Sequence, residues 1–263
     1  MDNDLTLALE LADLADAITL EHFRSDRLVV ETKPDLTPVS EADRAVETLL
    51  RKRIGEERPD HGVLGEEFGA EGSQRARWII DPIDGTKNYV RGIPVFATLI
   101  ALQRDGVGVV GVCSAPALGR RWWAARGAGA FADGRPIRVS RVADLGDAQL
   151  CHSSLDLWEA HGLEDGFREL ARRCWRTRGF GDFWMHALVA EGAADVALEP
   201  EVSLWDLAAL QVIVEEAGGR FTDLAGRARA DGGSAVTSNG LLHDEVLAAL
   251  RPAGGPGAQA AQR

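Results

Sequence analysis

Two acidic residues, Asp81 and Asp84, stand three positions apart in the stretch RWIIDPIDGTKNYV, residues 77–90. They follow the apolar run WII, which is typical of a short buried strand. Two carboxylates that converge repel each other unless a cation lies between them, and a hard divalent ion such as Mg²⁺ takes oxygen ligands. The N–H groups of Gly85 and Thr86, at the start of a predicted helix, would suit a phosphate oxygen. The alternative is that both acids only shape a turn.

Four further acidic residues could belong to the same site, and each also has a purely structural interpretation. Glu66 and Glu67 follow a short apolar strand in VLGEEFG, where solvated turn residues are common. Asp206 opens the apolar segment WDLAALQVIV, where an acid can serve as a helix cap. Asp43 lies three residues after Ser40, which is the spacing of a capping box. Taken one at a time, these residues leave both interpretations open.

The elements that would position these acids can be read from apolar spacing. Helical periodicity predicts an amphipathic helix over residues 7–23 and a second helix over residues 41–54, entered at Ser40. The segment ETKPDLTPVS between them reads as a loop broken by prolines. Because Pro82 cannot donate to a sheet ladder and restricts the residue before it to an extended backbone, we expect the central strand to end at Asp81.

A glycine-rich stretch, GVGVVG at residues 106–111, formally matches the dinucleotide-binding pattern G-x-G-x-x-G. That pattern needs a strand before the glycines and a helix after them, whereas here valines continue past the glycines. Two strands joined at Asp105-Gly106 fit better, so an NAD-binding protein is disfavoured. The six histidines show no metal-ligand spacing and read as surface or packing residues. From about residue 143 the chain alternates strands and helices, which is α/β texture.

The composition limits the partners and the compartment. The 263 residues carry a net charge of −12, so a nucleic-acid or anionic membrane surface is disfavoured. Three cysteines without a C-x-x-C pair predict reduced thiols, as in a cytosol. The N-terminus lacks the basic region of a signal peptide, and no apolar run approaches the ~18 residues of a membrane span. We therefore expect a cytoplasmic protein with no membrane partner.

Three strings taken together resemble one family. GEE, WIIDPIDGTKNYV, and WDLAAL followed by EEAGG are similar to the inositol-monophosphatase-like, lithium-sensitive Mg²⁺-dependent phosphatases, from the first helix to about Leu250. The resemblance implies an α/β (α+β) fold, a layered α-β-α-β-α sandwich that is usually dimeric. It implies one catalytic unit over residues 1–250, with the site between an N-terminal α+β half (about 1–142) and a C-terminal α/β half (about 143–250). Residues 251–263 lack apolar periodicity and are predicted to be a disordered tail.

The resemblance also implies a set of metal ligands, carried over residue by residue. Glu66, Asp81 and the carbonyl of Ile83 match the ligands of a first Mg²⁺. Asp81, Asp84 and Asp206 match those of a second, so that Asp81 bridges the two ions. A third, weaker ion would lie near Glu66, and the working site would then hold two or three Mg²⁺.

The same resemblance assigns the residues that act on the phosphate. The amides of Gly85 and Thr86 match the phosphate cradle. Thr86 and Asp43 match the pair that orients and deprotonates the attacking water. Asp43 would then both cap its helix and act as a base. With Glu66, which would hold the third ion, they form the predicted catalytic set. Phosphate monoesters hydrolyse extremely slowly unaided, so a nucleophile and charge neutralisation are both required.

The resemblance implies a small-molecule phosphate ester as the substrate, and further strings indicate which one. TKNYVRGIPVF, SAPALGRRWWAARG, RGFGDF and LEPEVSLWDLAAL look like the histidinol-phosphatase branch of bacterial histidine synthesis. Glu199 matches the family position that touches the alcohol portion of the substrate. Histidinol phosphate carries an ammonium and an imidazole, and acids at Asp182 and Glu199, with Phe183 and Trp184 nearby, would suit such a cation.

The residues that contact the substrate, and the identity of the phosphate ester, both have alternatives that remain open at this point. Asp84 and Asp206 border the metals and are also predicted to contact substrate, while Asp182 could instead cap the helix that follows it. Lys87 and Arg91 add positive charge, which would fit a second anionic group such as that of fructose 1,6-bisphosphate. Inositol 1-phosphate is the other alternative within the family.

Overall fold

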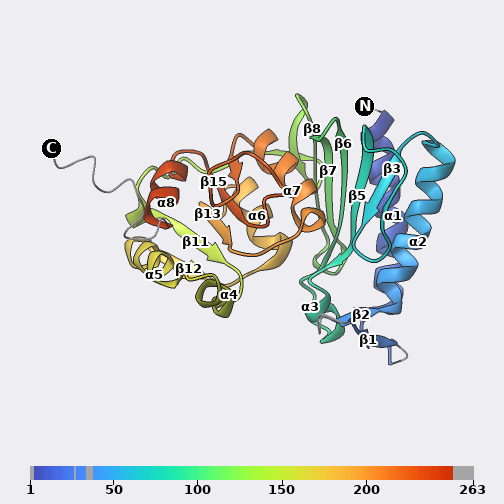
Figure 1. Ribbon diagram of the computed structural model, residues 1–263, viewed down its shortest axis with the longest axis horizontal. Helices are drawn as coiled ribbons and strands as arrows, with labels where there is room; N and C mark the ends of the chain where they lie inside the picture. The colour runs from blue at the N-terminus through green and yellow to red at the C-terminus, as the bar shows by residue number, and fades with distance from the viewer. Residues whose placement is uncertain (1–2, 27, 34–37, 251–263) are drawn as a thin grey trace.

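Five layers make up the computed structural model, which describes residues 3–26, 28–33 and 38–250. They are a pair of helices, an eight-stranded sheet, a second pair of helices, a five-stranded sheet and a group of three helices, seen from right to left in Figure 1. The predicted α-β-α-β-α sandwich is therefore confirmed. The predicted tail at residues 251–263 lies outside the described residues.

The eight-stranded sheet contains the strand that carries the first acids. Its neighbours pair antiparallel except β3 and β5, which are parallel. The strand order is β10 (Arg135–Ile137), β9 (Gly129–Ala132), β8 (Arg120–Ala125), β7 (Val107–Ala115), β6 (Ala97–Arg104), β5 (Ala76–Asp84), β3 (Gly62–Gly65) and β4 (Gly69–Glu71).

Strand β5 does not end at Asp81, so the prediction drawn from Pro82 was wrong. The strand runs on to Asp84, and its register against β6 shifts between Asp81 and Asp84. Pro82 has no N–H to donate, but its carbonyl accepts a hydrogen bond from the hydroxyl of Thr98 on β6 at 2.7 Å. The proline therefore produces an irregularity in the ladder rather than its end, and both acids stay on one strand.

Helices α1 (Asn3–His22) and α2 (Glu41–Glu57) cover the outer face of this sheet (Figure 1). Leu11 of α1, Leu50 of α2 and Trp78 of β5 are fully buried in their common core. Both predicted helices are confirmed. The predicted loop between them was wrong in part, because β1 (Val30–Thr32) and β2 (Pro38–Ser40) pair antiparallel there. A proline is tolerated as the first residue of such a strand.

Helices α6 (Asp182–Ala190) and α7 (Leu204–Glu216) fill the space between the two sheets. Two of the three glycines of the G-x-G-x-x-G match, Gly108 and Gly111, lie where α7 crosses β7. A Cβ atom at Gly111 would lie 2.3 Å from the carbonyl oxygen of Ala209, and one at Gly108 would lie 2.6 Å from Cγ2 of Val212. These glycines permit close helix–sheet packing in the β6–β7 hairpin, which confirms the hairpin interpretation over a cofactor loop.

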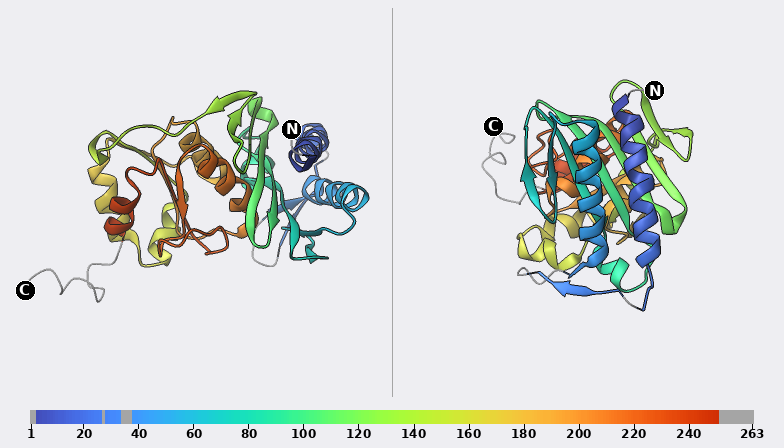
Figure 2. Two further views of the ribbon diagram at one scale, coloured as in Figure 1. Left: turned by 90° about the horizontal axis from the view of Figure 1, so that it is seen from above. Right: turned by 90° about the vertical axis from the view of Figure 1, so that its right-hand side faces the viewer.

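The five-stranded sheet and its outer helices complete the sandwich (Figures 1 and 2). The strand order is β12 (Arg176–Arg178), β11 (Gln149–His152), β13 (Val196–Glu199), β15 (Ala235–Ser238) and β14 (Arg220–Thr222). The outer helices are α4 (Leu155–Ala160), α5 (Glu164–Arg173) and α8 (His243–Leu250). The alternation predicted from about residue 143 is confirmed. Among the described helices, none is long and apolar enough to cross a membrane.

Candidate active site

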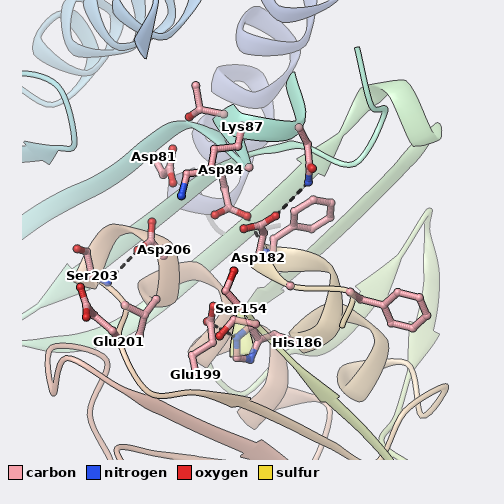
Figure 3. Close-up of a pocket in the computed structure, with 18 of the residues that line it drawn as sticks. Asp81, Asp84, Lys87, Ser154, Asp182, His186, Glu199, Glu201, Ser203 and Asp206 are labelled. Carbon is pink, nitrogen blue, oxygen red and sulfur yellow. Dashed lines mark hydrogen bonds and ion pairs between the residues drawn. The ribbon is translucent and has the colours of Figure 1, made fainter. Parts of the chain in front are cut away.

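Three acids meet where β5 approaches the start of α7. Asp81 and Asp84 come from β5 and Asp206 from the first turn of α7, and one carboxylate oxygen of each lies within 4.8 Å of the others. Ser203 fixes Asp206 by donating its backbone N–H at 2.8 Å, so the predicted helix-cap role of Asp206 is present as well. Figure 3 shows the three side chains around one pocket.

The electrostatics of this cluster are unfavourable without a cation. Burial, followed by the charge of neighbouring acids, raises the pKa of Asp81 and Asp84 well above the ordinary value. Burial likewise raises the pKa of Asp206 to about 7. Three carboxyl groups, two buried and one half-buried, can offer only oxygen atoms and match the donor set of a hard divalent ion, which would favour their ionised forms. The cluster therefore fits a divalent metal ion.

Glu66 borders the same pocket but is paired in this structure with a lysine. The Nζ atom of Lys33 lies 2.8 Å from Oε1 of Glu66 and 2.6 Å from Oε1 of Glu67. Burial alone would lower the pKa of Lys33, but its bonds to both glutamates raise it above the ordinary value. Glu47 of α2, which is fully buried, accepts the Glu67 backbone N–H at 2.7 Å and so fixes the turn. Nothing in the sequence spacing indicated Lys33 or Glu47.

Asp43 caps its helix with one carboxylate oxygen and turns the other toward Thr86. Oδ2 accepts the N–H of Ser40 at 2.8 Å and its hydroxyl at 2.5 Å, so the capping interaction is present. Oδ1 lies 3.5 Å from the hydroxyl of Thr86, which donates to the Ile83 carbonyl at 2.9 Å. Burial, with a contribution from the charge of Glu66, raises the pKa of Asp43 to about 6.

The turn after β5 has the geometry expected of a phosphate cradle. Gly85 has a positive φ of 79°, and α3 (Thr86–Val90) begins at the next residue, as predicted. The first amides of a helix have no partner within it and can bind an external oxygen. A Cβ at Gly85 would lie 3.0 Å from the Val95 carbonyl oxygen, so the close approach as well as the positive φ favours glycine.

Asp182 does not cap α6, so this alternative was wrong. Gly181 is the residue before the helix, and the Phe183 N–H donates to Oδ2 of Asp84 at 2.6 Å. Asp84 thus supplies from β5 the acceptor that the start of α6 needs. Asp182 has a positive φ of 47° and accepts the side-chain amide of Asn88 at 3.1 Å. Because Asp84 occupies the capping position, the carboxylate of Asp182 is left for another role.

Two further acids, Asp182 and Glu199, come from the C-terminal half of the chain and line the same pocket. Burial, then the charge of Glu199, raises the pKa of Asp182 to about 6, while Lys87 opposes the shift. Glu199 ends β13, is buried, and receives a hydrogen bond from His186 across 3.0 Å. This histidine was interpreted from the sequence only as a surface or packing residue.

Of the two aromatic residues expected beside these acids, Phe183 borders the cavity and Trp184 does not. Phe183 is buried against Trp122, with ring centroids 6.1 Å apart. Trp184 packs on Phe180 at 5.0 Å and is not among the described residues that line the cavity. Phe183 does line the cavity, together with Phe180 and Trp205. Helical spacing could not show which ring of the FGDFW stretch faces inward, since that depends on the tilt of α6.

Most of these acids line one cavity of about 590 Å³. Its lining includes Glu66, the three-acid cluster, the Gly85–Thr86 turn, Asp182 and Glu199. Lys87 also lines it, whereas Arg91 does not. Asp43 is fully buried behind Thr86. The fold thus joins the three-acid cluster, the glycine turn before α3 and a separate pair of acids in one pocket.

Known proteins are similar to this chain in both sequence and fold. Residues 1–254 match the family model described as the inositol monophosphatase family. The chain is 60% identical to a histidinol-phosphatase of Mycobacterium tuberculosis, over 94% of this chain and 98% of that protein. It is 55% identical to a histidinol-phosphatase of Streptomyces coelicolor, over 94% and 97% of the two chains.

More distant relatives have other names. A fructose-1,6-bisphosphatase/inositol-1-monophosphatase of Thermotoga maritima is 37% identical over 80% of each chain. The solved structure of an IMPase from Thermotoga maritima superposes with a TM-score of 0.86 at 34% identity, covering 95% of this chain and 97% of that one.

Proposed function

Because the chain belongs to the inositol monophosphatase family, we propose that it is a phosphoric monoester hydrolase that converts histidinol phosphate to histidinol and phosphate. The observation that carries this proposal is the pair of acids, Asp182 and Glu199, in the same cavity as the metal-binding cluster. A substrate with a phosphate at one end and an ammonium at the other would match both ends. The histidinol-phosphatase relatives support the same substrate.

Mg²⁺ is the proposed cofactor, with two or three ions per site. Asp81, Asp84 and Asp206 would hold the metals, with Glu66 and the Ile83 carbonyl as further ligands. When bound, Mg²⁺ supplies Lewis-acid activation of water and neutralises phosphate charge. Because Lys33 already balances the charge of Glu66 in this structure, we expect the third ion, which would lie near Glu66, to bind most weakly.

The residues of the chain then bind the phosphate and move one proton. The amides of Gly85 and Thr86 hold phosphate oxygens. The Thr86 hydroxyl orients the attacking water. The water gives a proton to this hydroxyl as the hydroxyl gives its own proton to Oδ1 of Asp43, which lies 3.5 Å from Oγ1 of Thr86. A base with a pKa of about 6 is ionised at neutral pH and still accepts a proton. As the new P–O bond forms, the bond to the histidinol oxygen breaks, and that oxygen takes a proton from solvent.

Recognition of the alcohol portion is assigned to Asp182 and Glu199. A charge-assisted bond from a buried carboxylate to an ammonium contributes on the order of 1.5–3 kcal/mol, or about one to two decades in specificity. Asp84 and Asp206, which also line the cavity, remain predicted substrate contacts. A bisphosphate substrate is the second candidate, since Lys87 places a positive charge in the cavity lining.

The test compares the specificity constants of four phosphate esters with the Mg²⁺-loaded protein: histidinol phosphate, inositol 1-phosphate, fructose 1,6-bisphosphate and 3′-phosphoadenosine 5′-phosphate. We expect histidinol phosphate to be preferred. Glu199→Gln should weaken it by about one to two decades and affect inositol 1-phosphate far less. The matched control is Glu201→Gln, at an exposed lining residue that bonds His161. A higher specificity constant for inositol 1-phosphate in the unmodified protein would refute the substrate assignment.

Other family properties are proposals of the same kind. We propose a homodimer in the cytoplasm that is inhibited by lithium and acts in histidine biosynthesis. We also propose that residues 1–250 form a single catalytic unit, because the acids of the cavity come from both halves of the chain.

A further inference from the structure

His186 is a fully buried histidine whose two ring nitrogens both have partners. Its Nδ1 lies 2.8 Å from the hydroxyl of Thr237 on β15, and its Nε2 lies 3.0 Å from Oε2 of Glu199 on β13. It projects from α6 and still lines the cavity beside Glu199 (Figure 3). A helix and two strands thus meet at one imidazole.

The partners determine which nitrogen carries the proton of a neutral ring. An ionised carboxylate can only accept, so Nε2–H donates to Glu199, and Nδ1 accepts the O–H of Thr237. The hydroxyl and the imidazole then form a chain of donors that ends on one carboxylate oxygen. The other oxygen of Glu199, Oε1, has no hydrogen-bond partner among the described residues, although Glu199 lines the cavity.

We propose that His186 is a positioning residue for substrate selectivity, which holds Glu199 so that Oε1 faces the ammonium of the substrate. The inference rests on the proposed function, because it assigns Glu199 to the cationic end of histidinol phosphate. A carboxylate whose second oxygen is already fixed by a hydrogen bond loses less side-chain freedom when it binds a cation than one that must be ordered on binding. His186 acts only through Glu199 and does not touch the substrate.

The competing interpretation is that His186 only satisfies the core, and the chain offers a matched control for it. His243 is also fully buried, and its nitrogens bond the hydroxyls of Thr222 and Ser238, each at 2.9 Å. It does not line the cavity. A variant at His243 should therefore reveal what loss of a buried imidazole costs in stability alone.

The experiment measures kcat and KM of the full-length, Mg²⁺-loaded protein for histidinol phosphate and for inositol 1-phosphate. His186→Met removes both hydrogen bonds at similar volume, and His186→Gln keeps an N–H donor for Glu199. We expect His186→Met to raise the KM for histidinol phosphate on the order of tenfold, with a smaller change in kcat and in both constants for inositol 1-phosphate. His186→Gln should restore much of the loss, and His243→Met should leave the ratio of the two specificity constants near that of the unmodified protein.

A double variant tests whether His186 acts through Glu199. His186→Met in the Glu199→Gln background should cause little further loss of selectivity, because the group that it positions is already changed. Equal losses for both substrates, or additive losses in the double variant, would overturn the proposal while leaving the proposed function intact. If the unmodified protein does not prefer histidinol phosphate, the proposed function fails, and the inference fails with it.

Discussion

Asp43→Asn separates the two roles of Asp43 because the amide has the shape of the carboxyl but cannot accept a proton as a base. The variant can keep its oxygen toward the Ser40 N–H, which now bonds Oδ2 at 2.8 Å. Its NH₂ group then faces Thr86. We expect turnover to fall by roughly two to four orders of magnitude, the usual contribution of a general base.

The effect of Asp43→Asn on stability can be worked from the structure. Burial raises the pKa of Asp43 from 3.8 to about 6 in the folded protein. Because the folded protein then binds the proton more tightly than the unfolded chain, the protonated carboxyl contributes to stability at low pH. A pKa shift of about two units corresponds to about 3 kcal/mol, which the unmodified protein loses as the pH rises from about 4 to about 6. Asparagine does not titrate, and its poorer cap costs about 1 kcal/mol. The variant should therefore be about 1 kcal/mol less stable at pH 4 and about 2 kcal/mol more stable at pH 8.

The assay is chemical unfolding in EDTA at pH 4, 6 and 8, paired with turnover at pH 8 after Mg²⁺ is restored. Chelation matters because bound metal would change the charge around the buried carboxyl. Normal turnover in a folded variant would leave Asp43 with only its capping role. The same stability difference at pH 4 and pH 8 would refute the argument from burial.

Three further predictions follow from the same contacts. EDTA should abolish hydrolysis, Mg²⁺ should restore both activity and thermal stability, and lithium should inhibit; undiminished turnover in chelator would contradict the mechanism. Burial raises the pKa of Asp43 to about 6 without metal, and bound Mg²⁺ would lower it, so kcat/KM for histidinol phosphate should fall at or below about pH 6; a profile that stays flat down to pH 4 would exclude Asp43 as that base. Gly111→Ala should cost about 1–3 kcal/mol, since its Cβ would lie 2.3 Å from the carbonyl oxygen of Ala209. Gly55→Ala, in an open position on α2, is the control and should stabilise by about 0.5–1 kcal/mol in urea unfolding.

The acids of the metal cluster were accessible from the sequence because their signals are local. Asp81 and Asp84 share one short strand, and Asp206 stands three residues after its capping partner Ser203. The family resemblance added that these two segments meet, which neither segment shows alone. The layered fold followed in the same way, from strings spread over nearly the whole chain.

The interactions that the sequence did not reveal are tertiary. Lys33 and Glu66 are 33 positions apart, and neither spacing nor composition links them. The bond between His186 and Glu199 depends on how α6 packs against β13, which helical periodicity does not specify. Pro82 was misjudged for a related reason, since a strand tolerates a missing donor when a neighbour such as Thr98 bonds the adjacent carbonyl.

The junction of β5 and α6 links the two ends of the cavity. Asp84 belongs to the acidic cluster and also accepts the Phe183 N–H at the start of α6. One residue earlier, Asp182 is held in a positive-φ backbone by its bond to Asn88 of α3. The start of α6, which also carries His186 one turn further on, is thus fixed by side chains of the metal-binding half. The spacing between the Gly85–Thr86 turn and the acids of the other half is therefore set by hydrogen bonds between the halves. Asp182 and His186 belong to α6, whereas Glu199 belongs to β13, so the position of this acidic pair depends on how the helix packs against that strand.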